Sequence, residues 1–173
     1  WKAMNAGIAA SSAEFVACLD ADSTIKPDSL VNMLPHFADN EVAVVLPMLY
    51  VDQPKNLLQK VQWYEYVINM FYRKIAGFLN SIHVAPGPFS LYRKNVLLAV
   101  GCFREGYHTE DLEICLRLQN AHYKIVQTTD AVAYTESPDR IKELYHQRLR
   151  WNLGSTRNIL SYRHMLFNSR YGD

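Results

Sequence analysis

The sequence has little net charge, few cysteines and no regular histidine spacing, and each shortage excludes a class of function. Lysine and arginine (18) nearly balance aspartate and glutamate (17), so the net charge of +1 offers no basic field for nucleic acid. The three cysteines, Cys18, Cys102 and Cys115, form no CxxC pair, and the six histidines form no HxH or HxxxH pair. A disulfide framework and a zinc site are therefore not expected, and a reducing compartment is favoured.

Long apolar runs are also missing. The longest, Val42–Val51, is about ten residues with Pro47 inside it, whereas a membrane-spanning helix needs roughly 20. No signal-peptide pattern opens the chain, which begins with Trp1 rather than methionine. We therefore expect a piece of a longer protein that is soluble or peripheral by itself. Its 49% of hydrophobic residues is enough for the core of one globular domain.

Helix-like and strand-like patterns alternate along the chain, which predicts an α/β fold with much parallel strand pairing. Thr109 is expected to cap the helix that follows it, and Ser137-Pro138 is expected to start the last helix. The predicted helices cover residues 3–13, 27–37, 56–79, 110–120 and 138 to beyond 151, and the predicted strands cover 15–19, 41–49, 89–92, 124–127 and 131–134.

Segment 56–79 carries the clearest period. Apolar residues recur at steps of three and four, and polar residues fill the other side, so the segment predicts a long amphipathic helix. One interpretation packs the apolar side on the sheet, and the other places it against a membrane or a partner, because aromatic residues widen it. The apolar side consists of Leu57, Val61, Tyr64, Ile68, Phe71, Ile75 and Leu79, and the polar side includes Gln62, Glu65, Asn69 and Arg73.

Two acidic motifs lie where functional residues are common. Asp20 and Asp22 follow a predicted buried strand, and in open α/β sheets ligands bind beyond the carboxyl ends of strands. Two carboxylates one residue apart can hold a hard divalent cation together with a phosphate-bearing ligand. Glu110 and Asp111 open a predicted helix, where a carboxylate that faces a cleft can act as a base. A turn or cap would explain the first pair without function, and the helix dipole would explain the second.

A third motif lies on the last predicted helix. At about 100° per residue, Gln147, Arg150 and Trp151 share one face. A guanidinium can clamp phosphate oxygens and an indole can stack on a sugar, so this face suits a charged, ring-shaped ligand. The alternative is a solvated arginine face with Trp151 filling a gap in the core.

The order of these motifs resembles that of the processive family 2 glycosyltransferases, the membrane-bound synthases of cellulose, chitin, hyaluronan and poly-N-acetylglucosamine. The resemblance runs over essentially the whole chain and rests on Lys2–Gly7, Asp20-Ala21-Asp22, Gly87–Arg93, Thr109-Glu110-Asp111 and Gln147–Trp151. It implies a GT-A fold, which is a nucleotide-sugar-binding α/β sheet flanked by helices. Here it implies one partial domain over residues 1–173 that lacks the family's first βαβ unit.

The resemblance also implies roles for single residues. Asp20 and Asp22 match the DxD element, with Asp22 favoured as the ligand of the Mg²⁺ or Mn²⁺ that bridges the diphosphate of a UDP-sugar. Asp111 matches the general base, and the helix N-terminus is expected to keep it ionised and to lower its basicity. The other expected contacts are Lys2 and Arg150 at the donor, and Gly87, Glu110, Gln147 and Trp151 at the glycan acceptor.

The reaction that the resemblance implies is inverting transfer of a hexose to the hydroxyl of a growing β-linked polysaccharide or another glycan. It also implies an integral membrane protein with this domain on the cytoplasmic side, anchored through segments absent from this chain, with a partner subunit as a further candidate. Where some synthases carry a cysteine-glycine-serine turn, this chain has Pro86-Gly87-Pro88, so the sugar stays open.

Two alternative functions remain open at this point. Asp20-Ala21-Asp22-Ser23-Thr24 also fits the nucleophile loop of haloacid-dehalogenase-like phosphatases, in which the first aspartate is phosphorylated and the second acts as an acid. The chain would then need a later strand that ends in paired acids, whereas Glu110 and Asp111 open a predicted helix. The other alternative is a catalytically inactive, glycosyltransferase-like binding domain.

Overall fold

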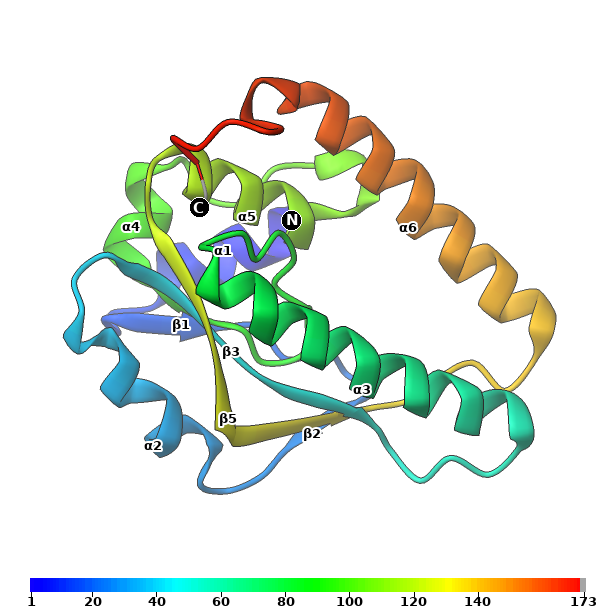
Figure 1. The fold of residues 1–173 in the computed structure, drawn as a ribbon. Helices are drawn as coiled ribbons and strands as arrows, with labels where there is room; N and C mark the ends of the chain where they lie inside the picture. The colour runs from blue at the N-terminus through cyan, green and yellow to red at the C-terminus, as the bar shows by residue number, and fades with distance from the viewer. Residues whose placement is uncertain (172–173) are drawn as a thin grey trace.

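The computed structural model describes residues 1–171 and shows a five-stranded sheet with helices around it, in the strand order β1-β4-β3-β5-β2 (Figure 1). The strands are β1 (Phe15–Ala17), β2 (Ser23–Ile25), β3 (Val42–Val51), β4 (Leu91–Arg93) and β5 (Lys124–Thr135). The helices are α1 (Lys2–Ala10), α2 (Ser29–Met33), α3 (Leu57–Phe78), α4 (Lys94–Ala99), α5 (Glu110–Asn120) and α6 (Ile141–Ser161). Short 3₁₀ turns lie at Leu34–Ala38, Gly106–His108 and Arg163–Met165. The predicted α/β class is confirmed.

Strand pairing differs from the expectation of much parallel pairing. Within residues 1–171, β3 and β5 are the one parallel pair, whereas β1–β4, β3–β4 and β2–β5 are antiparallel. The antiparallel partners β1, β2 and β4 are each three residues long. Such short segments carry too little sequence pattern to reveal which neighbour they pair with or in which direction.

The two strands predicted at 124–127 and 131–134 form one strand, β5. The register along β3 changes within it, because Leu46 lies opposite Gln127 whereas Met48 lies opposite Val132. Residues 128–131 therefore bulge out beside Pro47, which has no N–H to offer a central ladder. The predicted break marks the place of this bulge.

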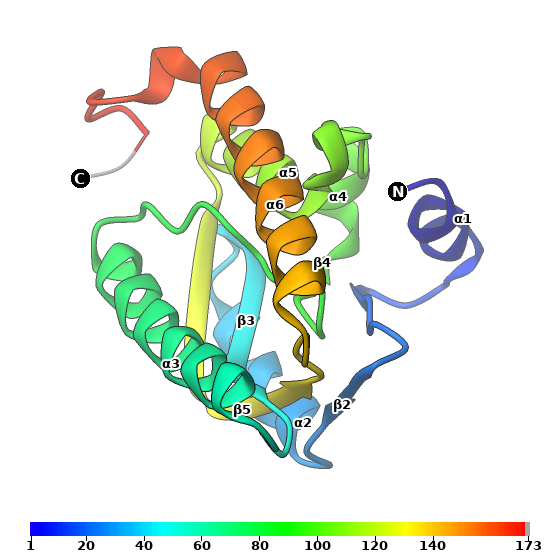
Figure 2. The same ribbon diagram turned by 90° about the vertical axis from the view of Figure 1, so that its right-hand side faces the viewer.

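Two sheet faces are covered by different helices, which agrees with the layers in Figures 1 and 2. One core cluster packs α4 and α5 on the sheet through side chains such as Leu97, Ile114 and Leu118. The other packs α2 and the following turn on the opposite face through Met33 and Phe37. These two layers hold the strand ends and the start of α5 in place.

Local caps explain where the long helices begin. The Asn56 side chain accepts a hydrogen bond from the Gln59 N–H (2.8 Å), which starts α3 one residue inside the predicted range. Helix α5 covers the predicted residues 110–120. The expectation that Ser137-Pro138 starts the last helix is wrong, because α6 begins at Ile141. The carbonyls of Ser137 and Pro138 instead accept hydrogen bonds from Gln59 and Gln62 of α3.

Helix α3 turns its apolar side to the solvent. The seven residues of that side are 43% to 78% exposed. The inward side carries Gln62, whose amide donates to the Pro138 carbonyl (2.8 Å), and Met70, whose sulfur accepts from the Leu49 N–H (3.0 Å). The interpretation that packs the apolar side on the sheet is therefore wrong, because the mixed side makes the contacts with β3 and the loop before α6.

Candidate active site

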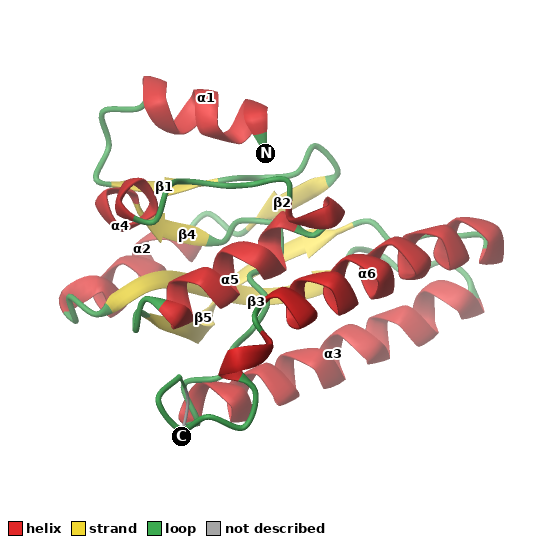
Figure 3. Ribbon diagram, turned by 90° about the horizontal axis from the view of Figure 1, so that it is seen from above, coloured by secondary structure: helices red, strands yellow, loops and turns green. Residues whose placement is uncertain are grey.

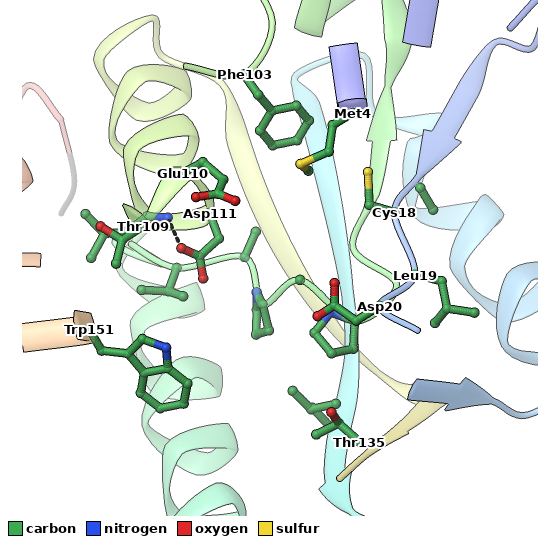
Figure 4. Close-up of a pocket in the computed structure, with 18 of the residues that line it drawn as sticks. Met4, Cys18, Leu19, Asp20, Phe103, Thr109, Glu110, Asp111, Thr135 and Trp151 are labelled. Carbon is green, nitrogen blue, oxygen red and sulfur yellow. Dashed lines mark hydrogen bonds between the residues drawn. The ribbon is translucent and has the colours of Figure 1, made fainter. Parts of the chain in front are cut away.

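The predicted motifs meet in a single large cavity of about 1390 Å³, lined by residues of α1, α3, α5, α6 and the loops beside β1 and β4. Figure 4 shows Asp20 on one side of it, Glu110 and Asp111 on another, and Trp151 at the edge nearest α3. Eight of the nine predicted site residues line it: Asp20, Asp22, Gly87, Glu110, Asp111, Gln147, Arg150 and Trp151. The ninth, Lys2, is exposed on α1, where its ammonium lies 5.3 Å from the ring of Trp1, and its role stays a prediction.

The DxD carboxylates lie in the loop between β1 and β2. Buried Ser23 fixes this loop: its Oγ donates a hydrogen bond to Asp22 Oδ1 (3.0 Å) and lies 3.0 Å from Thr135 Oγ1 on β5. Burial raises the pKa of the Asp20 carboxyl, and the negative charges of Asp22 and Glu110 raise it further, whereas Arg150 lowers it. Carboxylates from two distant motifs and one arginine therefore share the same electrostatic environment.

This donor set fits a hard divalent cation whose coordination is completed by a phosphate ligand. Carboxylate oxygens are the ligands that Mg²⁺ and Mn²⁺ prefer, and the mutual repulsion that raises the pKa of Asp20 would be relieved by a positive ion. Within residues 1–171 no group of three or more histidine, cysteine, aspartate or glutamate side chains is placed to hold a metal by itself. Asp20 and Asp22 would therefore supply only part of the coordination sphere, and phosphate oxygens of a nucleotide and water would supply the rest.

The loop around Gly87 joins the two acidic motifs. At one end the Phe89 N–H donates to the Cys18 carbonyl (2.8 Å), and at the other the Ala85 N–H donates to the Asp111 carbonyl (3.5 Å). A Cβ on Gly87 would lie 2.7 Å from Asp20 Oδ2, which is closer than a side chain tolerates. The loop passes directly against the Asp20 carboxylate, so a side chain at position 87 would displace that carboxylate.

Asp111 lies in the first turn of α5 with its side chain facing the cavity (Figure 4). The Leu112 N–H donates to Asp111 Oδ1 (2.9 Å). Burial nevertheless raises the pKa of Asp111 from 3.8 to about 6, and the hydrogen bond from Leu112 only partly opposes that rise. The N–H groups of the helix N-terminus do lower the pKa of Asp111, as expected, but desolvation outweighs them, so the net basicity of Asp111 is raised rather than lowered.

Arg148, which lies between Gln147 and Arg150, holds the third motif in place. Arg148 pairs with Glu65 of α3 (Nη2 to Oε2, 2.7 Å), and its guanidinium lies 4.4 Å from the centre of the Trp151 ring. This ion pair connects α6 to α3, whose ribbons are neighbours in the view of Figure 3 and separate in that of Figure 1, and Arg150 lines the cavity. Buried Gln147 Oε1 has no hydrogen-bond partner among the described residues, so it is available to a ligand.

Two residues of α6 that the sequence did not single out fix the turn before Asp111. Buried Asn158 donates from Nδ2 to the Gly106 carbonyl (2.7 Å) and to Thr109 Oγ1 (2.9 Å). Gly154 lets the helix approach, since a Cβ there would lie 2.5 Å from Thr109 Oγ1 and 2.8 Å from the Tyr107 carbonyl oxygen. A glycine inside a helical pattern was the available signal for such a close approach.

Fold and site together define a glycosyltransferase of the GT-A type. Three solved structures share the fold. The mannosyltransferase PcManGT from Pyrobaculum calidifontis, in complex with GDP-Man and Mn²⁺, matches with a TM-score of 0.69 at 18% identity over 94% of this chain and 43% of that one. TarS from S. aureus matches with a TM-score of 0.55 at 20% identity over 79% of this chain and 24% of that one. Mannosyl-3-phosphoglycerate synthase from Rubrobacter xylanophilus matches with a TM-score of 0.52 at 13% identity over 93% and 51%.

The chain belongs to glycosyl transferase family group 2, whose family model matches residues 15–171. Poly-beta-1,6-N-acetyl-D-glucosamine synthase from Staphylococcus epidermidis is 32% identical over 163 residues, and the same enzyme from Staphylococcus aureus is 29% identical over the same length. Each match covers 91% of this chain and 39% of the relative, so the chain spans about two fifths of the length of these curated relatives. The predicted membership of the family is confirmed.

The close approach at Gly154 gives a test of the site's construction. We expect Gly154→Ala to push α6 away from Thr109, because the added methyl would overlap it. Overpacking of this kind costs about 1–3 kcal/mol of stability, and displacing the Asp111 turn by about 1 Å lowers transfer roughly 10²-fold. Thermal unfolding and transfer rate measure both effects in the intact protein.

Gly77→Ala is the matched control for this prediction. A Cβ on Gly77 of α3 would meet the flexible Ile82 side chain at an ordinary 3.4 Å, and Gly77 does not line the cavity. This control should keep the wild-type rate and melting temperature. If Gly154→Ala also kept both, the contact between α6 and the Asp111 turn would not matter for the reaction.

Proposed function

We propose that the chain forms the catalytic part of an inverting glycosyltransferase that moves a hexose from a UDP-sugar to the hydroxyl of a growing β-linked glycan. One observation supports this proposal above the others: the DxD carboxylates, Asp111 and Arg150 line the same cavity. The names of the relatives make UDP-N-acetylglucosamine the first donor to test and an N-acetylglucosamine oligosaccharide the first acceptor.

At the donor end, the carboxylates of Asp20 and Asp22 would hold Mg²⁺ or Mn²⁺. When bound, such an ion neutralises the negative charge that builds on a departing diphosphate. Arg150, whose charge already acts on Asp20, adds a fixed guanidinium at the same place. Gly87 keeps room beside Asp20, and Ser23 keeps Asp22 in position.

At the acceptor end, Asp111 takes the proton from the attacking hydroxyl. A pKa of about 6 leaves this carboxylate ionised at neutral pH and makes it a stronger base than an ordinary aspartate. The hydroxyl oxygen forms its bond to the anomeric carbon as the bond to the diphosphate breaks on the opposite side. Single displacement inverts the configuration, so an α-linked donor gives a β-linked product. Gln147, Glu110 and Trp151 would line the path of the acceptor.

The phosphatase alternative finds no support in the structure. Its paired acids would have to follow a strand, whereas Glu110 and Asp111 open α5 after a 3₁₀ turn, and the family match covers the same residues. The inactive-domain alternative would require loss of a catalytic group. Asp20, Asp22, Asp111 and Arg150 are all present and line one cavity.

A pair of variants tests the assignment of roles. Asp111→Asn keeps the size of the side chain and removes the proton acceptor, so transfer should fall about 10²–10⁴-fold while UDP affinity changes little. Asp22→Ala removes a metal ligand, so both metal-dependent UDP binding and transfer should be lost. Calorimetry with UDP and Mn²⁺, and a UDP-release assay on the intact protein in membranes, measure the two properties separately.

Two outcomes would contradict this assignment. Near wild-type turnover of Asp111→Asn would remove Asp111 as the base and make Glu110 or His108 the next candidate. Loss of UDP binding in Asp111→Asn as severe as in Asp22→Ala would move Asp111 into the nucleotide site.

We also propose that the protein works at the cytoplasmic face of a membrane, with the apolar side of α3 against the lipid. No helix within residues 1–171 is long and apolar enough to cross a bilayer, so contact through this chain would be with the surface. The apolar side of α3 is exposed and rich in aromatic residues, and the exposed cation Lys60 lies at its edge, three residues after Leu57 and four before Tyr64. Apolar and basic residues together suit the anionic surface of a cytoplasmic leaflet.

Cysteine labelling tests this location. In membranes that contain the intact protein, Ile68→Cys should react with a water-soluble maleimide at least about tenfold more slowly than Lys74→Cys, because lipid would cover position 68. Both positions are exposed on α3, and labelling of the native cysteines is subtracted as the wild-type background. Equal labelling of the two variants would show that lipid does not cover this side of α3.

A further inference from the structure

The inward side of α3 brings an arginine without a partner into the active-site cavity. Arg73 lines the cavity together with Tyr66 and Asn69 of the same helix. Its Nη1 atom is buried and has no hydrogen-bond partner within residues 1–171, and no carboxylate there forms an ion pair with it. The Arg73 guanidinium therefore lies at the cavity wall, and its Nη1 donates no hydrogen bond to any group in the described part of the chain.

The two arginines of residues 1–171 that are buried as whole residues, Arg93 and Arg117, have partners for their guanidinium groups. Arg117 pairs with Glu113 (2.7 Å) and donates to the Cys102 carbonyl (2.6 Å). Arg93 donates to the Phe37 carbonyl (2.7 Å) and to two further carbonyls. Leaving a buried charged donor unpaired costs more than leaving a neutral one unpaired. The contrast indicates that the partner of Arg73 is a ligand of the cavity.

The surroundings of Arg73 place it on the Asp111 side of the cavity. Burial lowers the pKa of its guanidinium, and the negative charge of Asp111 acts in the opposite direction. An arginine stays protonated in such a site, so the group remains a donor of hydrogen bonds. Asp111 is the carboxylate whose charge acts on Arg73, whereas the charge of Arg150 acts on both Asp20 and Asp111.

We propose that Arg73 binds the terminal sugar of the acceptor glycan, with Nη1 donating a hydrogen bond to an oxygen close to the hydroxyl that Asp111 deprotonates. This inference rests on the proposed function and adds a binding residue to it. A sugar presents hydroxyl, ring and, in an N-acetylated residue, carbonyl oxygens, and each of them can accept from a guanidinium. Holding the acceptor at a second point would align its hydroxyl with Asp111.

Kinetics with separate donor and acceptor readouts test the proposal. Arg73→Gln and Arg73→Lys are compared in the intact protein with UDP-N-acetylglucosamine as donor and an N-acetylglucosamine oligosaccharide as acceptor. Loss of a hydrogen bond from a charged donor should lower kcat/KM for the acceptor at least about tenfold in Arg73→Gln, with partial recovery in Arg73→Lys. The dissociation constant of UDP and the slow hydrolysis of the donor without acceptor should stay within about twofold of wild type, as expected for a group that does not touch the diphosphate.

Lys74→Gln is the matched control, because it removes the same charge from the neighbouring exposed position and should change nothing.

A loss of UDP affinity equal to the loss in acceptor kcat/KM would overturn the proposal and assign Arg73 to the diphosphate. Unchanged acceptor kinetics in both Arg73 variants would also overturn it, and so would an equal fall of all rates together with a lower melting temperature. If Arg73→Gln does not fold, the acceptor kinetics of Arg73→Lys decide. Absence of transfer by the wild-type protein with any UDP-sugar would refute the proposed function itself, which distinguishes the two failures.

Discussion

The short loop that contains Gly87 is the constraint on which the site depends. It is hydrogen-bonded to the end of β1 through Phe89 and Cys18, and to the start of α5 through Ala85 and Asp111. The loop therefore connects the two acidic motifs at one cavity, and a side chain at Gly87 would displace the Asp20 carboxylate. The sheet and α5 are rigid, well-packed elements, so the distance between donor and acceptor groups is set by packing.

Gathering carboxylates in one cavity has an electrostatic consequence. Burial and the negative charges of Asp22 and Glu110 raise the pKa of Asp20. Burial also raises the pKa of Asp111, to about 6. A cation at the DxD pair and Arg150 would offset the repulsion at the donor end. Burial raises the pKa of both carboxyls: it gives Asp111 the increased basicity that the proposed base requires, and a cation bound at Asp20 would offset its effect there.

The sequence predicts local structure well and relative placement poorly. The capping pair Asn56–Gln59 and the three-and-four period located α3 almost to the residue, whereas strands of three residues carried too little pattern to reveal their antiparallel pairing. The period of α3 identified two faces but not which one points inward. The period assigns Arg73 to the polar side of the helix, and packing of the apolar side on the sheet would have left that side in solvent. In the structure Arg73 lines the cavity. The three motifs indicated seven of the eight predicted residues that line the cavity, and the family resemblance added Gly87. Asn158 was missed because its partner, the turn at Gly106 and Thr109, is distant in sequence.

The pH dependence of kcat/KM for the donor, at saturating acceptor, tests the central claim that Asp111, a partly buried carboxylate with a raised pKa, is the general base. A base works only when it is deprotonated, so activity should fall as pH decreases through its pKa. The account predicts a slope of about one in log(kcat/KM) below a midpoint near pH 6, with a plateau above pH 7. Binding of UDP-N-acetylglucosamine over the same range should not follow that curve, because each phosphate of a UDP-sugar keeps one negative charge throughout and Asp111 is not proposed to touch the donor. A profile that is flat from pH 5 to pH 8, or one that tracks binding of the UDP-sugar, would contradict the account.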